Sequence, residues 1–266
     1  MKTSENHVNQ SSAANIFGQT RTRVANNHAL ISPDGYVTSP LTNWTDTDGV
    51  VLISPVMRGG QGGPRFVQYL VHGTNNGRTS GAAKGVERLI YVLSGEATLD
   101  GVTLCAESFA WFPPADTYDL AVSDGCTLLV FEKQYEAIGS GSDNKIPQRV
   151  VGKLKDAPVE PFLGDPDAML ATLLPIESGF DMAVNVFTFQ PGAALPFVET
   201  HIMEHGLYMS AGQGVYRLDD QWYPVGKGDT IWMASYCPQW FVAMGKEPAQ
   251  YIYYKDRHRD PMMASS

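Results

Sequence analysis

The sequence is short of cysteine and of long apolar runs, and each shortage excludes a class of protein. Only three of the 266 residues are cysteines, and they are far apart without a CxxC pair (Cys105, Cys126 and Cys237). This argues against a disulfide framework and fits a reducing compartment. No apolar run approaches the length of a membrane span, and residues 1–14 lack the apolar region of a signal peptide. We therefore expect a cytoplasmic protein that does not enter a membrane.

Charge is also scarce, since only 18% of the residues are charged and the net charge is −9. No stripe of lysine and arginine is present, which excludes a nucleic-acid partner. Glycine and proline are plentiful by contrast, with 26 and 17 residues scattered through the chain. This composition favours many short strands joined by turns over long surface helices.

The chain contains an internal repeat, which is the first organising feature to look for. A glutamate, a tyrosine and a glycine of the first half recur in the second half at an offset of 117 residues, as Glu87/Glu204, Tyr91/Tyr208 and Gly95/Gly212. The segments around Trp111 and Trp232 also correspond, and each half ends in an apolar run. Two similar halves indicate two similar domains.

The apolar and aromatic segments between the turns predict short strands in both halves. They are 66–72, 88–93, 97–99, 109–112 and 127–131, and then 182–189, 207–210, 214–218, 230–233 and 250–254. Closely spaced strands repeated twice predict an all-β fold of two tandem jelly-roll barrels with short helical connections. The expected division is a polar tail (1–15), a first barrel (16–135), a linker (136–161) and a second barrel (162–266), with a short helix at 165–174.

A cluster of metal-ligand residues lies in the second half. Residues two apart on a strand point to the same face, so Glu199 and His201 project together, and so does His205 if the strand continues. Imidazole and carboxylate are common ligands of divalent first-row metals. The cluster predicts part of a metal site on one barrel wall, although polar residues can also line a barrel mouth without a metal.

The first half serves as an internal control. At the offset of 117, the places of Glu199, His201 and His205 are taken by Ala82, Lys84 and Arg88, and the place of Gln239 by Tyr118 or Asp119. Cations in place of histidines cannot hold a divalent ion, so only the second barrel is expected to have the site. Glu204 recurs as Glu87 in the half without the site, and we expect it to be structural.

The last predicted strand adds a cation to the site. With a period of two, Tyr251, Tyr253 and Lys255 share one face. A lysine that faces a barrel interior is costly unless an anion binds it, which predicts a substrate with a carboxylate. The alternative is that Lys255 reaches solvent at the end of the strand. Lys133, its expected counterpart in the first half, keeps this alternative open.

The pattern of glycines and ligands resembles a known family of barrels. Gly192-x6-Glu199-x-His201-x3-His205-x6-Gly212 is similar to the first cupin motif, and the second motif, after Gly228-Asp229, places its last ligand at Gln239. The chain resembles the (S)-ureidoglycine aminohydrolases in particular, a bicupin family of allantoin and purine degradation. The resemblance covers most of the chain and is densest at 199–205, 210–216, 222–229 and 253–256.

This resemblance implies a Mn²⁺ ion held by Glu199, His201, His205 and Gln239. It implies substrate contacts from Glu199, Gln239, Tyr251 and Lys255, of which we expect Glu199 and Lys255 to be catalytic. The implied reaction is hydrolytic deamination of (S)-ureidoglycine, a small ureido carboxylate, to (S)-ureidoglycolate and ammonia, in a homo-oligomer.

Two other classes of function stay open from the residues alone. One is another cupin enzyme with a single metal that acts on a small carboxylate as an oxygenase, isomerase or lyase. The combination of Glu199 and Gln239 favours Mn²⁺ over an iron site for O2, because it is rich in oxygen ligands. The other is a non-enzymatic bicupin that binds a ligand, which would not require an intact ligand set.

Overall fold

The computed structural model describes residues 20–57, 62–137 and 146–259. Within these ranges the elements are β-strands and two short 3-10 turns, Pro33–Gly35 and Leu154–Asp156, with no α-helix. The all-β prediction is confirmed, and these turns are short helical connections of the expected kind. No helix there is long and apolar enough to cross a membrane.

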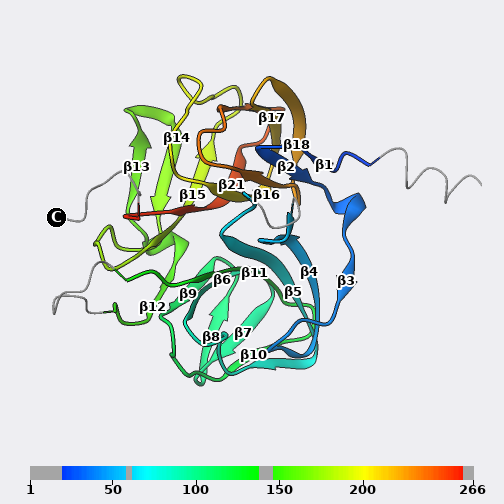
Figure 1. The fold of residues 1–266 in the computed structure, drawn as a ribbon, viewed down its shortest axis with the longest axis vertical. Helices are drawn as coiled ribbons and strands as arrows, with labels where there is room; N and C mark the ends of the chain where they lie inside the picture. Colours follow the sequence, from blue (N-terminus) through cyan, green and yellow to red (C-terminus); the bar gives the residue numbers. More distant parts are fainter. Residues whose placement is uncertain (1–19, 58–61, 138–145, 260–266) are drawn as a thin grey trace, which may run out of the picture.

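The first half forms a ten-stranded antiparallel sheet that curls on itself (Figure 1). Its main path runs β12-β9-β6-β11-β5-β10-β7-β8, and β4 extends it beside β5. The strands are β3 (Thr38–Ser39), β4 (Thr45–Ile53), β5 (Phe66–Thr79), β6 (Val86–Ser94), β7 (Glu96–Leu99), β8 (Val102–Cys105), β9 (Ser108–Phe112), β10 (Leu120–Val122), β11 (Thr127–Gln134) and β12 (Val150–Lys153).

The second half contains an eight-stranded sheet and a three-stranded sheet. The larger sheet has the order β1-β2-β19-β16-β21-β15-β14-β13 and the smaller one the order β18-β17-β20. The strands are β1 (Arg23–Val24), β2 (His28–Ile31), β13 (Val159–Phe162), β14 (Asp165–Thr172), β15 (Met182–Phe189), β16 (His205–Ala211), β17 (Gln213–Leu218), β18 (Gln221–Gly226), β19 (Thr230–Met233), β20 (Gln239–Met244) and β21 (Ala249–Asp256).

The helix expected at 165–174 is wrong, because this segment is strand β14. Alanine, methionine and leucine favour a helix locally, but β14 pairs with β13 on one side and with β15 on the other. Two antiparallel ladders satisfy its backbone groups, and this tertiary pairing overrides the local propensity.

Two segments cross the predicted domain boundaries. Strand β2, within the expected first barrel, pairs with β19 of the second half. Strand β12, within the expected linker, pairs with β9 of the first half. Part of that linker, 138–145, and the tail 1–15 lie outside the described residues. The division of the chain into these domains stays a prediction.

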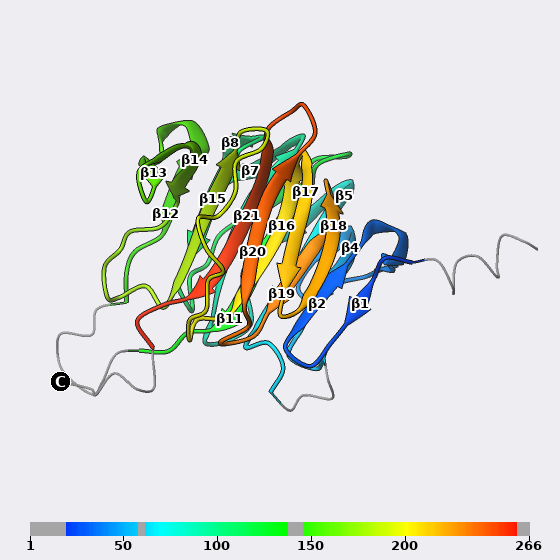
Figure 2. The same cartoon turned by 90° about the horizontal axis from the view of Figure 1, so that it is seen from above.

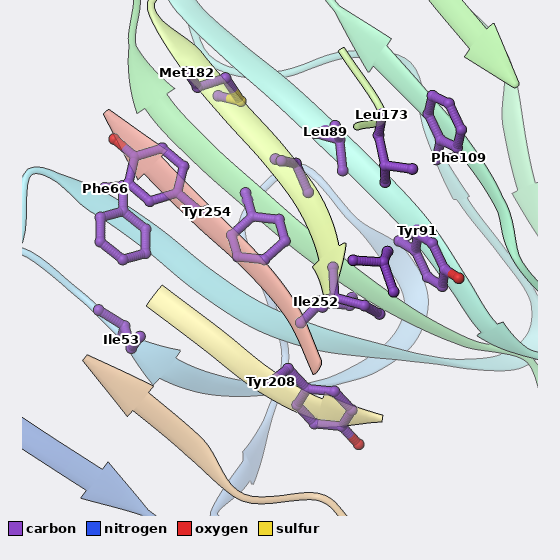
Figure 3. Packing of buried hydrophobic residues seen from close by; sticks show 14 of the residues in the cluster. Ile53, Phe66, Leu89, Tyr91, Phe109, Leu173, Met182, Tyr208, Ile252 and Tyr254 are labelled. Atoms are coloured by element: carbon purple, nitrogen blue, oxygen red, sulfur yellow. The ribbon is translucent and has the colours of Figure 1, made fainter. Parts of the chain in front are cut away.

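The core has three parts, and the largest lies between the two halves. There the outer faces of the large sheets pack together, with Phe66 stacked on Tyr254 at 4.1 Å between ring centroids (Figure 3). Figure 2, seen from above, shows the strands of the second half lying over those of the first half. The other two clusters fill the interiors of the two barrels. Joined by a broad apolar face, the barrels are expected to unfold together.

Candidate active site

The predicted site residues come from two walls of the second barrel. His205 begins β16, and Gln239 begins β20. Glu199 lies in the loop before β16 and forms an isolated β-bridge with Gln239, with N···O distances of 2.8 and 2.9 Å in the two directions. The expected strand from Glu199 to His205 is therefore wrong, since the backbone of residues 200–204 is not paired as a strand. The bridge brings Glu199 to the cavity instead.

Three side-chain nitrogens meet in this barrel. The Nε2 atom of His201 lies 3.0 Å from Nε2 of His205 and 3.0 Å from Nε2 of Gln239. The other ring nitrogen of His201, Nδ1, donates to the carbonyl oxygen of Met203 at 3.1 Å. This contact fixes the tautomer of His201 and leaves its Nε2 with a lone pair that is directed at the other two groups.

The two imidazoles are held in their neutral form. Burial, His201 and Lys255 hold the pKa of His205 well below its ordinary value. Burial, with Lys255, also lowers the pKa of His201. Neutral imidazole is the form that binds a metal, so no proton has to be removed from these rings near neutral pH.

The Glu199 carboxylate of the predicted ligand set does not join the three nitrogens as closely as these join one another. Among the residues that the structure describes, no three His, Cys, Asp or Glu side chains come together as a complete ligand group. His201, His205 and Gln239 are thus the assembled part, and Glu199 lines the same cavity beside them. Burial raises the pKa of Glu199 above its ordinary value, an effect that Lys255 opposes.

Lys255 faces the cavity and does not turn away to solvent. It lines the cavity together with Glu199, Tyr251 and Tyr253, as the strand periodicity predicts. Burial and Arg257 lower the pKa of Lys255, whereas Glu199 raises it. A partly desolvated ammonium on the strand next to His205 favours an anionic ligand.

The cavity is small and is lined by aromatic, aliphatic and polar side chains. Its volume is about 110 Å³, which suits a molecule of a few heavy atoms. Tyr216, Tyr251 and Tyr253 line it, and burial raises the pKa of Tyr253 to about 12, so its hydroxyl stays protonated at neutral pH. Sequence reasoning did not name Tyr216, although it is an inward-facing aromatic in the period-two pattern of β17.

The first barrel holds a different set at the corresponding places. The guanidinium of Arg88, which is 1% exposed, contacts Glu132 at 2.5 Å and Tyr118 at 2.7 Å. In the strand register Arg88 pairs with Glu132, as His205 pairs with Lys255. The counterpart of Lys255 is therefore Glu132, and the expected equivalence with Lys133 is wrong by one residue. Lys133 lies on the opposite face, where it contacts Asp181 at 2.7 Å.

Glu204 is structural, as its recurrence predicts. It is buried and accepts hydrogen bonds from the backbone and side chain of Arg65 and from the indole of Trp232. Its counterpart Glu87 accepts from Trp111 in the same way, at 2.8 Å. The repeat therefore preserves a glutamate–tryptophan contact in both halves.

The fold and the site together define a cupin protein with two barrels, one of which carries the ligand-type residues. The cupin-domain family model matches residues 185–254, which run from within β15 to within β21 and include all four predicted ligands. Oxalate decarboxylase of Bacillus subtilis, whose structure aligns with a TM-score of 0.64 at 11% identity over 89% of this chain and 78% of that one, shares the fold.

Proteins of higher sequence identity show which family of cupins the chain belongs to. The (S)-ureidoglycine aminohydrolase of Arabidopsis thaliana is 38% identical over 92% of this chain and 80% of its own length. That of Escherichia coli K12 is 34% identical over 88% of this chain and 90% of its own length. The crystal structure of protein Ylba from E. coli aligns with a TM-score of 0.77 at 31% identity, over 92% of this chain and 97% of that one. The chain belongs to the (S)-ureidoglycine aminohydrolase family.

Proposed function

We propose that this protein hydrolyses (S)-ureidoglycine to (S)-ureidoglycolate and ammonia in the breakdown of allantoin. The observation that carries the proposal is the meeting of His201, His205 and Gln239 in a small cavity that is also lined by Lys255 of the neighbouring strand β21. A cavity of about 110 Å³ suits the substrate in size, and the family membership supplies the reaction class.

Lys255 binds the carboxylate of the substrate. Its ammonium is the cation of the cavity wall, and its lowered pKa reflects the burial that a bound anion would compensate. A charge-assisted hydrogen bond in a partly desolvated site both fixes the carboxylate and orients the rest of the molecule. Tyr251, buried on the same face of β21 four residues before Lys255, lines the cavity farther along the strand.

The residues also fit a divalent metal, and the family relationship favours Mn²⁺. Two neutral imidazole nitrogens that face each other at 3.0 Å can share only one proton, so a cation satisfies both lone pairs better. His201, His205, Gln239 and Glu199 would hold it, a set with two oxygen donors that suits Mn²⁺. When bound, the metal supplies Lewis acidity and a template for the substrate.

Glu199 carries the proton in this scheme. The C–N bond to the substrate amine breaks while water forms the new C–O bond, and the departing amine takes up a proton to leave as ammonia. Glu199 lines the cavity, and burial raises the pKa of its carboxyl group above the ordinary value, so this group would take a proton from the attacking water and pass it to the departing amine. The ureido nitrogen on the same carbon assists the loss of the amine, so the protein mainly orients the molecule and directs water to one face.

We also propose that the protein is a cytoplasmic homo-oligomer. The outer face of the three-stranded sheet exposes Trp222 and Met244, which are 57% and 48% exposed, and such apolar side chains suit a contact between copies. All three cysteines are free, which is consistent with a reducing compartment.

The test is ammonia release from freshly generated ureidoglycine, measured against the spontaneous rate. The Mn²⁺-loaded protein is expected to accelerate release, and removal of the metal by a chelator or the Glu199→Ala substitution to abolish the acceleration. Release at the spontaneous rate by protein that still binds the metal would reject the reaction and leave the cupin fold intact.

A further inference from the structure

We infer that Asn185 is a positioning residue that makes the hydroxyl of Tyr253 a hydrogen-bond donor to the ureido carbonyl of the substrate. Neither residue was assigned a role in the site from the sequence. The inference rests on the proposed function, because it names the part of that substrate that Tyr253 would recognise.

The two residues are cross-strand neighbours in the second barrel. Asn185 of β15 pairs directly with Tyr253 of β21, and the next pair along the same two strands on this face contains Lys255. Asn185 is 4% exposed and points into the barrel, between Val184 and Val186, whose side chains lie in the core between the halves. A buried amide in an otherwise apolar strand is costly unless it forms a hydrogen bond.

That hydrogen bond determines what the phenol can do. Nδ2 of Asn185 donates to the hydroxyl oxygen of Tyr253 at 3.0 Å. Among the described residues, Oδ1 of Asn185 is buried without a hydrogen-bond partner. The side-chain amide therefore forms its hydrogen bond with Tyr253 alone. Because the phenol oxygen accepts from Asn185, its own O–H must be donated elsewhere, and Tyr253 lines the cavity.

The position of Tyr253 determines which group of the substrate its hydroxyl would contact. Its ring lies 5.5 Å from that of His205 between centroids, so the phenol stands beside the predicted ligands. Residues two apart on a strand are separated by about 7 Å, which places Tyr253 that far along β21 from the backbone of Lys255. With the substrate carboxylate on Lys255, the acceptor that remains for a neutral donor is the ureido carbonyl oxygen.

The inference is tested by calorimetric binding of two stable probes to the Mn²⁺-loaded protein. Ureidoacetate has both the carboxylate and the ureido group, whereas glycolate lacks the ureido group. Tyr253→Phe is expected to weaken ureidoacetate about five- to tenfold and to leave glycolate unchanged, as loss of one neutral hydrogen bond would. The matched control is Tyr254→Phe, which removes a buried hydroxyl that has no hydrogen-bond partner in the described ranges and lies on the opposite face of the same strand.

The role of Asn185 is tested by combining its substitution with Tyr253→Phe. Asn185→Leu keeps the volume but cannot hydrogen-bond, and it is expected to weaken ureidoacetate severalfold in the wild-type background and not at all in the Tyr253→Phe background. An equal loss in both backgrounds would show that Asn185 acts through packing and overturn its role. Unchanged ureidoacetate affinity in Tyr253→Phe would overturn the inference even if ammonia is released, whereas selective binding without ammonia release would reject only the proposed reaction.

Discussion

The two barrels place different chemistry on corresponding strands. In the first, Arg88 and Glu132 occupy facing positions on β6 and β11 and contact each other at 2.5 Å. In the second, the facing positions on β16 and β21 hold His205 and Lys255, which form no ion pair. The first barrel pairs the charge in its interior, Arg88 with Glu132, whereas the second leaves a cation and neutral imidazoles facing a cavity.

The comparison shows how one fold separates stability from function. The interior of the first barrel is closed by the Arg88 guanidinium, which also lies 5.1 Å from the centroid of the Trp44 ring. A fully satisfied polar network of this kind fixes a unique packing. Both halves contain buried polar groups without a hydrogen-bond partner among the described residues, and one of them, Oδ1 of Asn185, belongs to the residue that contacts Tyr253 of the cavity wall.

The largest effect is expected when the second barrel is given the pair of the first. The double variant His205→Arg/Lys255→Glu copies Arg88 and Glu132, so it should fold but lose metal binding and lower ammonia release by about a thousandfold or more. Circular dichroism and metal analysis of the purified variant check this. A variant that keeps stoichiometric metal would show that His205 is not a ligand.

Breaking the pair in the first barrel should affect stability and spare the site. Arg88→Met leaves the Glu132 carboxylate without its cation and is expected to lower the free energy of unfolding by about 3–5 kcal/mol. Urea unfolding measures this, and the Arg88→Met/Glu132→Gln variant should recover much of the loss. Metal binding of the folded single variant should be unchanged, and its disappearance would contradict the separation of the two barrels.

Removing the cation of the second barrel should affect substrate binding before metal binding. Lys255→Met is expected to raise KM about 10- to 100-fold, because a charge-assisted hydrogen bond to the carboxylate is lost. Steady-state ammonia release gives KM, and metal analysis serves as the control. An unchanged KM would mean that Lys255 does not bind the carboxylate.

The smallest effect concerns the buried glutamates that both halves share, and it depends on pH. Burial and the nearby Asp181 raise the pKa of Glu87 well above its ordinary value of 4.5. The unfolded chain therefore releases this proton at lower pH than the folded protein, so Glu87 costs stability increasingly as pH rises above 4.5. Glu87→Gln should thus stabilise the protein by about 1–3 kcal/mol at pH 7.5 and have no effect at pH 4. Thermal unfolding at the two pH values measures this, and equal effects at both would refute it.

Much of the fold could be predicted because its strands follow the period-two pattern. The predicted strands at 182–189 and 230–233 match β15 and β19 to the residue. Strand β4 was missed because Thr45-Asp-Thr-Asp-Gly49 has the composition of a turn, and its pairing with β5 contains two irregularities. Strand β14 was predicted as a helix for the opposite reason, since only long-range pairing makes it extended.

The site could be predicted in its residues but not in its assembly. Motif spacing identified the four candidate ligands, and strand alternation placed Tyr251, Tyr253 and Lys255 on one face, as the cavity lining confirms for these three. The bridge between Glu199 and Gln239 joins residues far apart in the sequence, and no local pattern predicts it. Asn185 could have been identified from the sequence, because it is a polar residue at an inward-facing position of a mostly apolar strand.

The central claim, that only one of the two barrels holds the metal, is tested most directly by the metal content of the purified protein. After loading with Mn²⁺ and removal of free ion, the account predicts one ion per chain in the wild type and none in His205→Arg/Lys255→Glu. Two ions per chain, or one that persists in the double variant, would contradict it.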